Sequence, residues 1–217
     1  MVLLFKLIVL FISLSFTAFS QVVMMTVPYL EKESVVYADD FTGDVGNLDD
    51  RENWLNDRPS EDIVIYNNSG DNVIKGGYTY YAYCAYDAVL NSDHWAEIKV
   101  DNIGSGFVGI IVRYDSSTGK YYLFMSDNSG SRLRIVQNGS ALSLFASGSA
   151  WQNGSVYRLE VVGYELRCYK DGVLDTSIDG DGKYTVGEPY KIDGNKAGVV
   201  TYSTGTSMAD DWKASSL

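Results

Sequence analysis

The sequence predicts an antiparallel all-β protein built as a two-sheet sandwich. Its central stretch, His94 to Asn128, alternates apolar and polar residues in three strand-length runs separated by turns rich in Gly, Ser and Asp. This alternation gives each strand one buried face and one solvent-exposed face. Similar runs recur to the C-terminus. No helix-period segment of useful length follows residue 20, although one short helical turn is expected within residues 47–60.

Twelve runs are predicted as strands, and turn-forming pairs such as Asn138-Gly and Asp171-Gly separate them. They are Val35–Phe41, Ile63–Tyr66, Tyr78–Tyr86, Trp95–Asp101, Phe107–Tyr114, Tyr121–Ser126, Arg132–Gln137, Ala141–Ala146, Tyr157–Val162, Glu165–Lys170, Ala197–Tyr202 and Met208–Ala214. Many short strands at this regular spacing favour a sandwich over an α/β fold.

The first twenty residues have the features of an export signal. An apolar run with a single Lys and no acid ends at small residues, Ala18 and Ser20. The run is short for a membrane span, and no basic cluster follows it. We therefore expect a signal peptide at residues 1–20, a short leader at 21–34 and a single sandwich domain at 35–217. Such a chain is secreted, periplasmic or on the cell surface, with no stable membrane insertion after cleavage.

The charge of the chain limits its partners. Cleavage removes Lys6, so the net charge falls from −11 to −12. Strong acidity argues against binding nucleic acid or anionic lipid through bulk electrostatics. It is compatible with calcium and with neutral or cationic glycans.

The two cysteines, Cys84 and Cys168, leave the redox chemistry open. Cys168 follows Tyr164 and Leu166 at period two, which predicts a core position. Export permits a disulfide, but a single pair does not establish one. Two buried thiols are favoured over a bridge.

The opening ADDFTG, followed by Leu48 and Trp54, resembles the start of domains of the concanavalin A-like lectin/glucanase superfamily, of the LamG-like jelly-roll type. The segments SDHWAEIKV, GFVGIIVRYDSSTGKYYLFM and VYRLEVVGYELRCYKDGVL fit the middle, and AGVVTYSTGTSMADDW fits the end. The resemblance implies a jelly-roll β-sandwich whose curved sheet often binds carbohydrate and whose first and last strands lie side by side.

That adjacency implies a candidate calcium site. It would bring Asp39 and Asp40 near Asp210 and Asp211, where four carboxylates repel one another unless a cation or backbone donors compensate them. Period two places Asp39 and Asp210 on the inner face. We expect a structural Ca²⁺ ion at this seam, or else solvent-exposed carboxylates that cap turns.

A second calcium hypothesis concerns residues 177–188, SIDGDGKYTVGE. Asp179, Asp181, Gly182 and Glu188 fall at positions 3, 5, 6 and 12 of an EF-hand loop. Position 1 is Ser177, and no helix pattern flanks the segment. An ordinary turn between strands is favoured.

Alternation also predicts a sugar-binding surface. Trp95 and Glu97 face outward from their strand, and an exposed Trp beside hydrogen-bonding groups can stack on and orient a sugar ring. Arg113 is expected outward with Gly109 and Ile111, opposite a buried set at residues 108, 110 and 112. The full set of predicted glycan-binding residues is Trp95, Glu97, Arg113, Tyr121, Tyr122, Arg132, Arg134 and Trp151. The alternative is a solvated face with ordinary cross-strand ion pairs.

An enzyme is the main alternative function. Glycoside hydrolysis needs two carboxylates in one cleft, and the E-x-D-x-x-E-like run that the resemblance would require is absent. In such an enzyme, Arg113 with Tyr121 or Tyr122, or else Glu97, would carry the chemistry, but the segments typical of alginate lyases of this fold are absent too. His94 is expected to be a turn residue rather than a base.

The sequence therefore favours an exported, non-catalytic carbohydrate-binding or surface-recognition domain. A polysaccharide-cleaving enzyme is the first alternative, and a structural or adhesive protein-binding module is the second. The identity of the glycan and the oligomeric state stay open.

Overall fold

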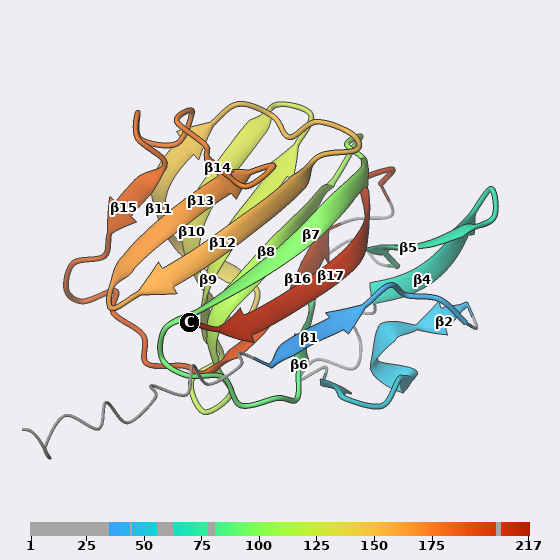
Figure 1. The fold of residues 1–217 in the computed structure, drawn as a ribbon, viewed down its shortest axis with the longest axis horizontal. Coiled ribbons are helices and arrows are strands. Elements are labelled where there is room, and N and C mark those ends of the chain that lie inside the picture. The colour runs from blue at the N-terminus through green and yellow to red at the C-terminus, as the bar shows by residue number, and fades with distance from the viewer. Residues whose placement is uncertain (1–34, 44, 56–62, 78–80, 203–204) are drawn as a thin grey trace, which may run out of the picture. The chain divides into compact units, whose positions relative to one another are not determined.

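The computed structural model describes residues 35–43, 45–55, 63–77, 81–202 and 205–217. These residues belong to one compact unit and form two antiparallel sheets (Figure 1). The predicted signal peptide and leader lie outside the described residues. Within the described ranges, no helix has the length and apolar character needed to cross a membrane.

The first sheet contains ten of the described strands. In order across the sheet they are β14 (Val173–Leu174), β13 (Glu165–Lys170), β12 (Val156–Val162), β7 (His94–Asn102), β17 (Met208–Ser216), β5 (Asp71–Gly76), β4 (Ile63–Asn68) and β2 (Gly46–Asn47). In addition, β1 (Val36–Asp39) pairs with β17, and β15 (Lys183–Thr185) pairs with β13. The predicted adjacency of the first and last strands is therefore confirmed.

The second sheet contains seven described strands. Their order is β11 (Ser140–Gly148), β10 (Gly130–Gln137), β9 (Lys120–Asp127), β8 (Phe107–Asp115), β16 (Lys196–Tyr202), β6 (Tyr81–Tyr86) and β3 (Trp54–Leu55). The expected short helical turn is the 3-10 helix η1 (Leu48–Asp50).

Each of the twelve predicted strands corresponds to an observed strand, and the two-sheet sandwich is confirmed. The prediction missed β5 and four strands of two or three residues, β2, β3, β14 and β15. β5 forms a hairpin with β4 but begins Asp71-Asn72, residue types that favour turns. Its few apolar residues form a run that is too short to predict a strand.

The main core lies between the sheets and follows the predicted alternation. Ala96, Ile98 and Val100 of β7 are fully buried there, as are the three inward residues of β8, Val108, Ile110 and Val112. Cys84 and Cys168 are both buried thiols, neither in a disulfide. Burial raises the pKa of the Cys168 thiol, which makes it a poor nucleophile.

A second apolar cluster lies on the opposite face of the seven-stranded sheet. It includes three tyrosines whose rings contact one another, Tyr83, Tyr114 and Tyr121, with centroids 5.2 to 6.1 Å apart. Ile111, Leu123 and other aliphatic residues complete it. Strands β8, β9 and β16 are thus buried on both faces, whereas many antiparallel sheets leave one face to water, and the edge strand β11 is largely exposed.

Candidate functional site

The eight predicted glycan-binding residues do not form one surface. Trp95 and Glu97 lie on the outer face of the ten-stranded sheet, as predicted, and are half-buried. The others are divided between the outer face of the seven-stranded sheet (Tyr121, Arg132 and Arg134), the main core (Tyr122 and Trp151) and a buried position at one end of the sandwich (Arg113).

On the ten-stranded sheet, Trp95 and Glu97 share a partner that sequence reasoning missed. Arg158 of β12 lies directly opposite Glu97 and donates two hydrogen bonds to its Oε2, from Nε at 2.9 Å and from Nη2 at 2.7 Å. Its guanidinium carbon also lies 4.1 Å from the centroid of the Trp95 ring. Trp95 and Arg158 therefore form a stacked pair, which Glu97 holds in place.

A second group of ion pairs lies beside the first on this face, centred on Arg167. Arg167 of β13 donates from Nη1 to Glu160 at 2.9 Å and from Nε to Glu165 at 2.6 Å. These two carboxylates raise the pKa of Arg167, so it stays charged. Tyr169 lies opposite Arg158 on the next strand.

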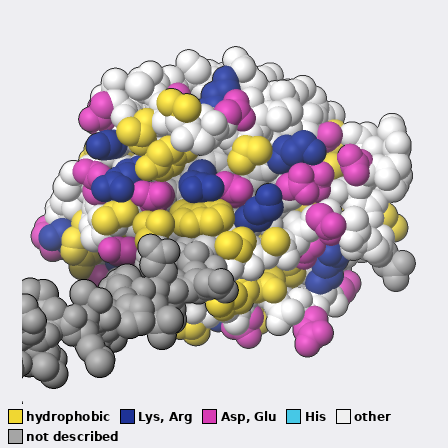
Figure 2. Space-filling view, viewed as in Figure 1, with side chains coloured by type: hydrophobic (Ala, Val, Ile, Leu, Met, Phe, Trp, Pro, Cys, Tyr) yellow, Lys and Arg dark blue, Asp and Glu magenta, His cyan; other side chains and the backbone are white. Residues whose placement is uncertain are grey.

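We call this surface the outer platform, and it comprises Trp95, Glu97, Arg158, Glu160, Glu165, Arg167, Tyr169 and Lys213. Figure 2 shows it facing the viewer, with Lys/Arg and Asp/Glu side chains alternating and hydrophobic side chains between them. Its three acidic and three basic residues balance in charge, although the whole chain carries −11. Within the described part of the chain, Arg158 Nη1 and Arg167 Nη2 have no hydrogen-bond partner.

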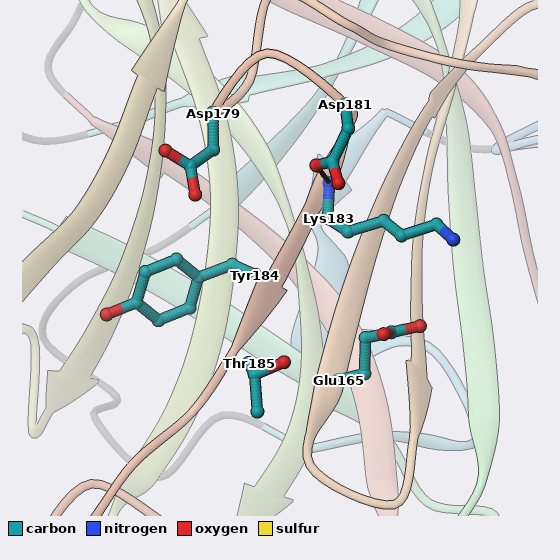
Figure 3. A pocket seen from close by; sticks show the side chains of 6 residues that line it. All are labelled: Glu165, Asp179, Asp181, Lys183, Tyr184 and Thr185. Atoms are coloured by element: carbon teal, nitrogen blue, oxygen red, sulfur yellow. Dashed lines mark hydrogen bonds between the residues drawn. The ribbon is translucent and has the colours of Figure 1, made fainter.

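The platform leads to an open pocket at the edge of its sheet (Figure 3). The lining residues come from β13, β15 and the turn before β15: Glu165, Asp179, Asp181, Lys183, Tyr184 and Thr185. Asp181 accepts a hydrogen bond from the Lys183 amide at 2.9 Å, which fixes the turn. The segment predicted as a possible EF-hand loop is thus a Gly/Asp turn that leads into an edge strand.

Two of the predicted aromatic binding residues lie in the core instead. Trp151 is 3% exposed and stacks on Tyr157 with ring centroids 4.4 Å apart. Tyr122 is fully buried, and its hydroxyl donates to the Tyr190 carbonyl and accepts from the Ile192 amide. Burial raises the pKa of Tyr122 to about 12. Predicting both as surface residues was wrong, and a tyrosine held in this way is not placed to act as a base.

The predicted outward orientation of Arg113 was also wrong. Arg113 is 2% exposed and donates to the carbonyls of Ile192, at 2.8 Å, and Gly163, at 2.7 Å. Its φ of +54° and the register shift after Val112 mark a β-bulge. The extra residue reverses the alternation, so Arg113 points into the molecule.

The remaining predicted residues, Tyr121, Arg132 and Arg134, lie far from Trp95 on the other sheet. Tyr121 is part of the second apolar cluster and is fully buried. Arg132 donates to Asp127 at 2.7 Å and to Ser129 at 2.9 Å, and Arg134 lies opposite Leu123. These contacts are structural, and the three residues add nothing to the outer platform.

The predicted calcium ligands do not meet. Asp39 is held by protein donors: Oδ1 accepts from Arg51 and from the Phe41 amide, and Oδ2 accepts from the Trp54 indole at 2.8 Å. Asp40 instead caps Thr42, and that hydrogen bond lowers the pKa of Asp40. The DDF and Trp segments of the resemblance thus serve to anchor the chain after β1.

The other two acids face away from this anchor. Asp210 lies opposite Lys99 on the outer side of the sheet, because a bulge at Asp211, with φ of +49°, shifts the alternation. Lys99 lies 3.8 Å from Asp210 and 3.5 Å from Asp211. Burial is the main cause that raises the pKa of Asp210. No group of three or more metal-binding side chains occurs among the described residues, whereas calcium takes six to eight oxygen ligands.

The sequence does contain a pattern that identifies the platform residues absent from the prediction, Arg158, Arg167 and Tyr169. In YRLEV and ELRCYK they alternate with the buried Leu159 and Cys168, so period two alone places them outward. Sequence alone did not show that β12 neighbours β7, with β13 on its other side. That pairing joins residues about sixty positions apart, such as Glu97 and Arg158.

No protein-family model matches the chain, and no curated protein sequence matches it. Solved structures do match in fold. A galectin-like protein of unknown function from Bacillus subtilis has a TM-score of 0.58 at 8% identity, covering 82% of this chain and 94% of that one. The carbohydrate-binding module CBM66 from Bacillus subtilis has a TM-score of 0.54 at 15% identity, covering 73% and 91%.

A β-1,3-1,4-glucanase, a lichenase derived from a mouse hindgut metagenome, has a TM-score of 0.51 at 9% identity. The match covers 84% of this chain and 99% of the glucanase. These similarities show that the chain has the concanavalin A-like jelly-roll fold, as the sequence resemblance implied. The same fold carries both binding modules and hydrolases, so the fold alone does not decide between them.

Proposed function

We propose that this chain is an exported, non-catalytic carbohydrate-binding domain that binds glycan on the outer platform. The observation that supports the proposal most is the Trp95–Arg158–Glu97 group. It joins a partly exposed aromatic ring to a charged guanidinium on the outer face of the ten-stranded sheet. Aromatic rings that contact the apolar face of a sugar, with polar groups beside them, are a common way to bind carbohydrate.

The geometry of the platform suits an extended chain. Neighbouring strands lie about 4.8 Å apart, so polar groups on β7, β12 and β13 repeat at roughly the spacing of one sugar unit. Arg158 and Arg167 each keep an unused amino group for a sugar hydroxyl. The carbohydrate-binding module and the glucanase among the structural neighbours are consistent with a glycan ligand.

A binding role is favoured over hydrolysis. A hydrolase needs one carboxylate that donates a proton and one that stays ionised, both facing the scissile bond. Glu160 and Glu165 are the close pair on the platform, and both are held by the same guanidinium. The bound glycan should therefore remain intact, and neither calcium nor EDTA should change its binding.

The test is a glycan screen on the chain without residues 1–20, followed by titration of any glycan that binds. We expect Trp95→Ala to weaken binding about 10-fold or more, since losing one aromatic contact costs on the order of 1.4 kcal/mol. Tyr66→Ala is the matched control, because Tyr66 is an exposed aromatic residue of the same sheet but lies away from the platform, on β4, with Lys75 over its ring. If glycan binding weakened equally in both variants, or did not weaken in Trp95→Ala, the outer platform would not be the binding site. Shortened products would indicate an enzyme.

A further inference from the structure

One histidine, His94, joins the two sheets at the end of the sandwich where Arg113 lies. It opens β7 in the ten-stranded sheet and is fully buried. Its Nε2 accepts a hydrogen bond from the Arg113 amide of β8 at 3.1 Å. Its Nδ1 lies 2.8 Å from the Asn91 carbonyl, so the ring proton is on Nδ1 and the ring is neutral. This contact is a hydrogen bond from one layer of the sandwich to the other.

Arg113 extends the contact to two further segments. Its guanidinium binds the Gly163 carbonyl in the β12–β13 turn and the Ile192 carbonyl in the segment before β16. Asp93 and Asp193 each lie 3.5 Å from it. Asp93 also accepts from the Gly163 amide at 2.8 Å. We call His94, Arg113, Asp93, Gly163 and Ile192 the end joint.

We propose that the end joint is an acid-sensitive latch, in which protonation of His94 breaks the contact between the sheets and releases the segments that Arg113 holds. A protonated ring has donors on both nitrogens. Nε2 would then oppose the Arg113 amide, which is also a donor, and the imidazolium would lie beside the Arg113 guanidinium. Both changes are unfavourable in a buried site.

The groups around the His94 ring affect how readily it takes up a proton. Arg113 from β8 disfavours the charged ring, and Asp93 from the preceding loop favours it. The residues opposite His94 on β12 and β17, Val161 and Ser216, carry no charge. The main effect is burial, which lowers the pKa of His94 to about 4.

The direction of the pH dependence follows from this shift. The closed joint has a pKa below the value of about 6.5 for an unburied histidine, so the open joint binds the proton more tightly. The latch is therefore fully stable above about pH 6.5 and weakens as the pH falls toward 4. With these two values, the open fraction rises about 70-fold between pH 7.5 and 4.5. Asp115, at the end of β8, has a lowered pKa and stays ionised over that range.

Residue-level hydrogen exchange on the chain without residues 1–20 tests the latch. We expect the protection factor of the Arg113 amide to fall about 70-fold between pH 7.5 and 4.5, while that of Ile65 in β4 changes little. A fall of equal size at both amides would overturn the proposal, since it would reflect global unfolding. So would constant protection at Arg113.

The variant His94→Gln is the control for the titration itself. Its side-chain oxygen can accept from the Arg113 amide but does not take up a proton in this range. We expect Arg113 protection in this variant to be nearly the same at both pH values. A fall as large as in the wild type would assign the pH effect to another group and overturn the latch. If the variant does not fold, the comparison of Arg113 with Ile65 in the wild type decides alone.

Discussion

Replacing Trp151 by Ala should lower the free energy of unfolding by about 3–5 kcal/mol, the usual cost of truncating a buried Trp. The Trp151 ring stacks on Tyr157 and lies edge-on to Phe124 at 4.9 Å, inside the main core. Truncation would leave a cavity that this close-packed aromatic group has no means to fill. Urea denaturation would show a lower midpoint with an unchanged slope.

Trp95→Ala is the matched comparison, because Trp95 is half-buried on the outer platform. We expect a loss of less than about 1.5 kcal/mol there, since a partly exposed ring loses less buried area. A stable Trp151→Ala variant with weakened glycan binding would contradict the structure and restore Trp151 to a binding surface.

Replacing Arg113 by Met should have the second largest effect, a loss of about 3 kcal/mol. The change leaves the buried carbonyls of Gly163 and Ile192 without their donor. Arg113→Lys should recover only part of the loss, because one ammonium group does not reproduce the planar fork that reaches both carbonyls. Thermal or urea unfolding measures all three proteins.

Arg132→Met supplies the control for removing an arginine. Arg132 pairs with Asp127 at the surface, with about a quarter of each side chain exposed. Such a pair contributes about 0–1 kcal/mol, so this variant should unfold close to the wild type. If Arg113→Met were equally harmless, the Arg113 contacts would be incidental, and the end joint would lose its basis.

The fold was predictable because each strand is a short local pattern. Period two placed the inward residues of β7 and β8 correctly and set Trp95 and Glu97 on the outer face. The same rule misplaced Arg113 and Asp210 for one shared reason. Each lies at a β-bulge, where a residue with positive φ, Arg113 itself or Asp211, adds a step to the alternation.

Two other misplacements have different causes. Trp151 lies between β11 and β12, where no alternation applies. Tyr121 and Tyr122 point to opposite faces of β9, and both are buried because β9 is covered on both faces. Local sequence shows which residues share a face, but burial of that face depends on contacts from distant parts of the chain.

The most direct test of the proposed function is a map of where a bound glycan touches the protein. Backbone amide shifts would be followed by nuclear magnetic resonance while a glycan from the screen is added to the chain without residues 1–20. We expect changes centred on β7, β12 and β13, around Trp95, Arg158 and Arg167. Changes centred on β8, β9 and β10 instead would place the ligand on the seven-stranded sheet and contradict the outer platform as the binding site.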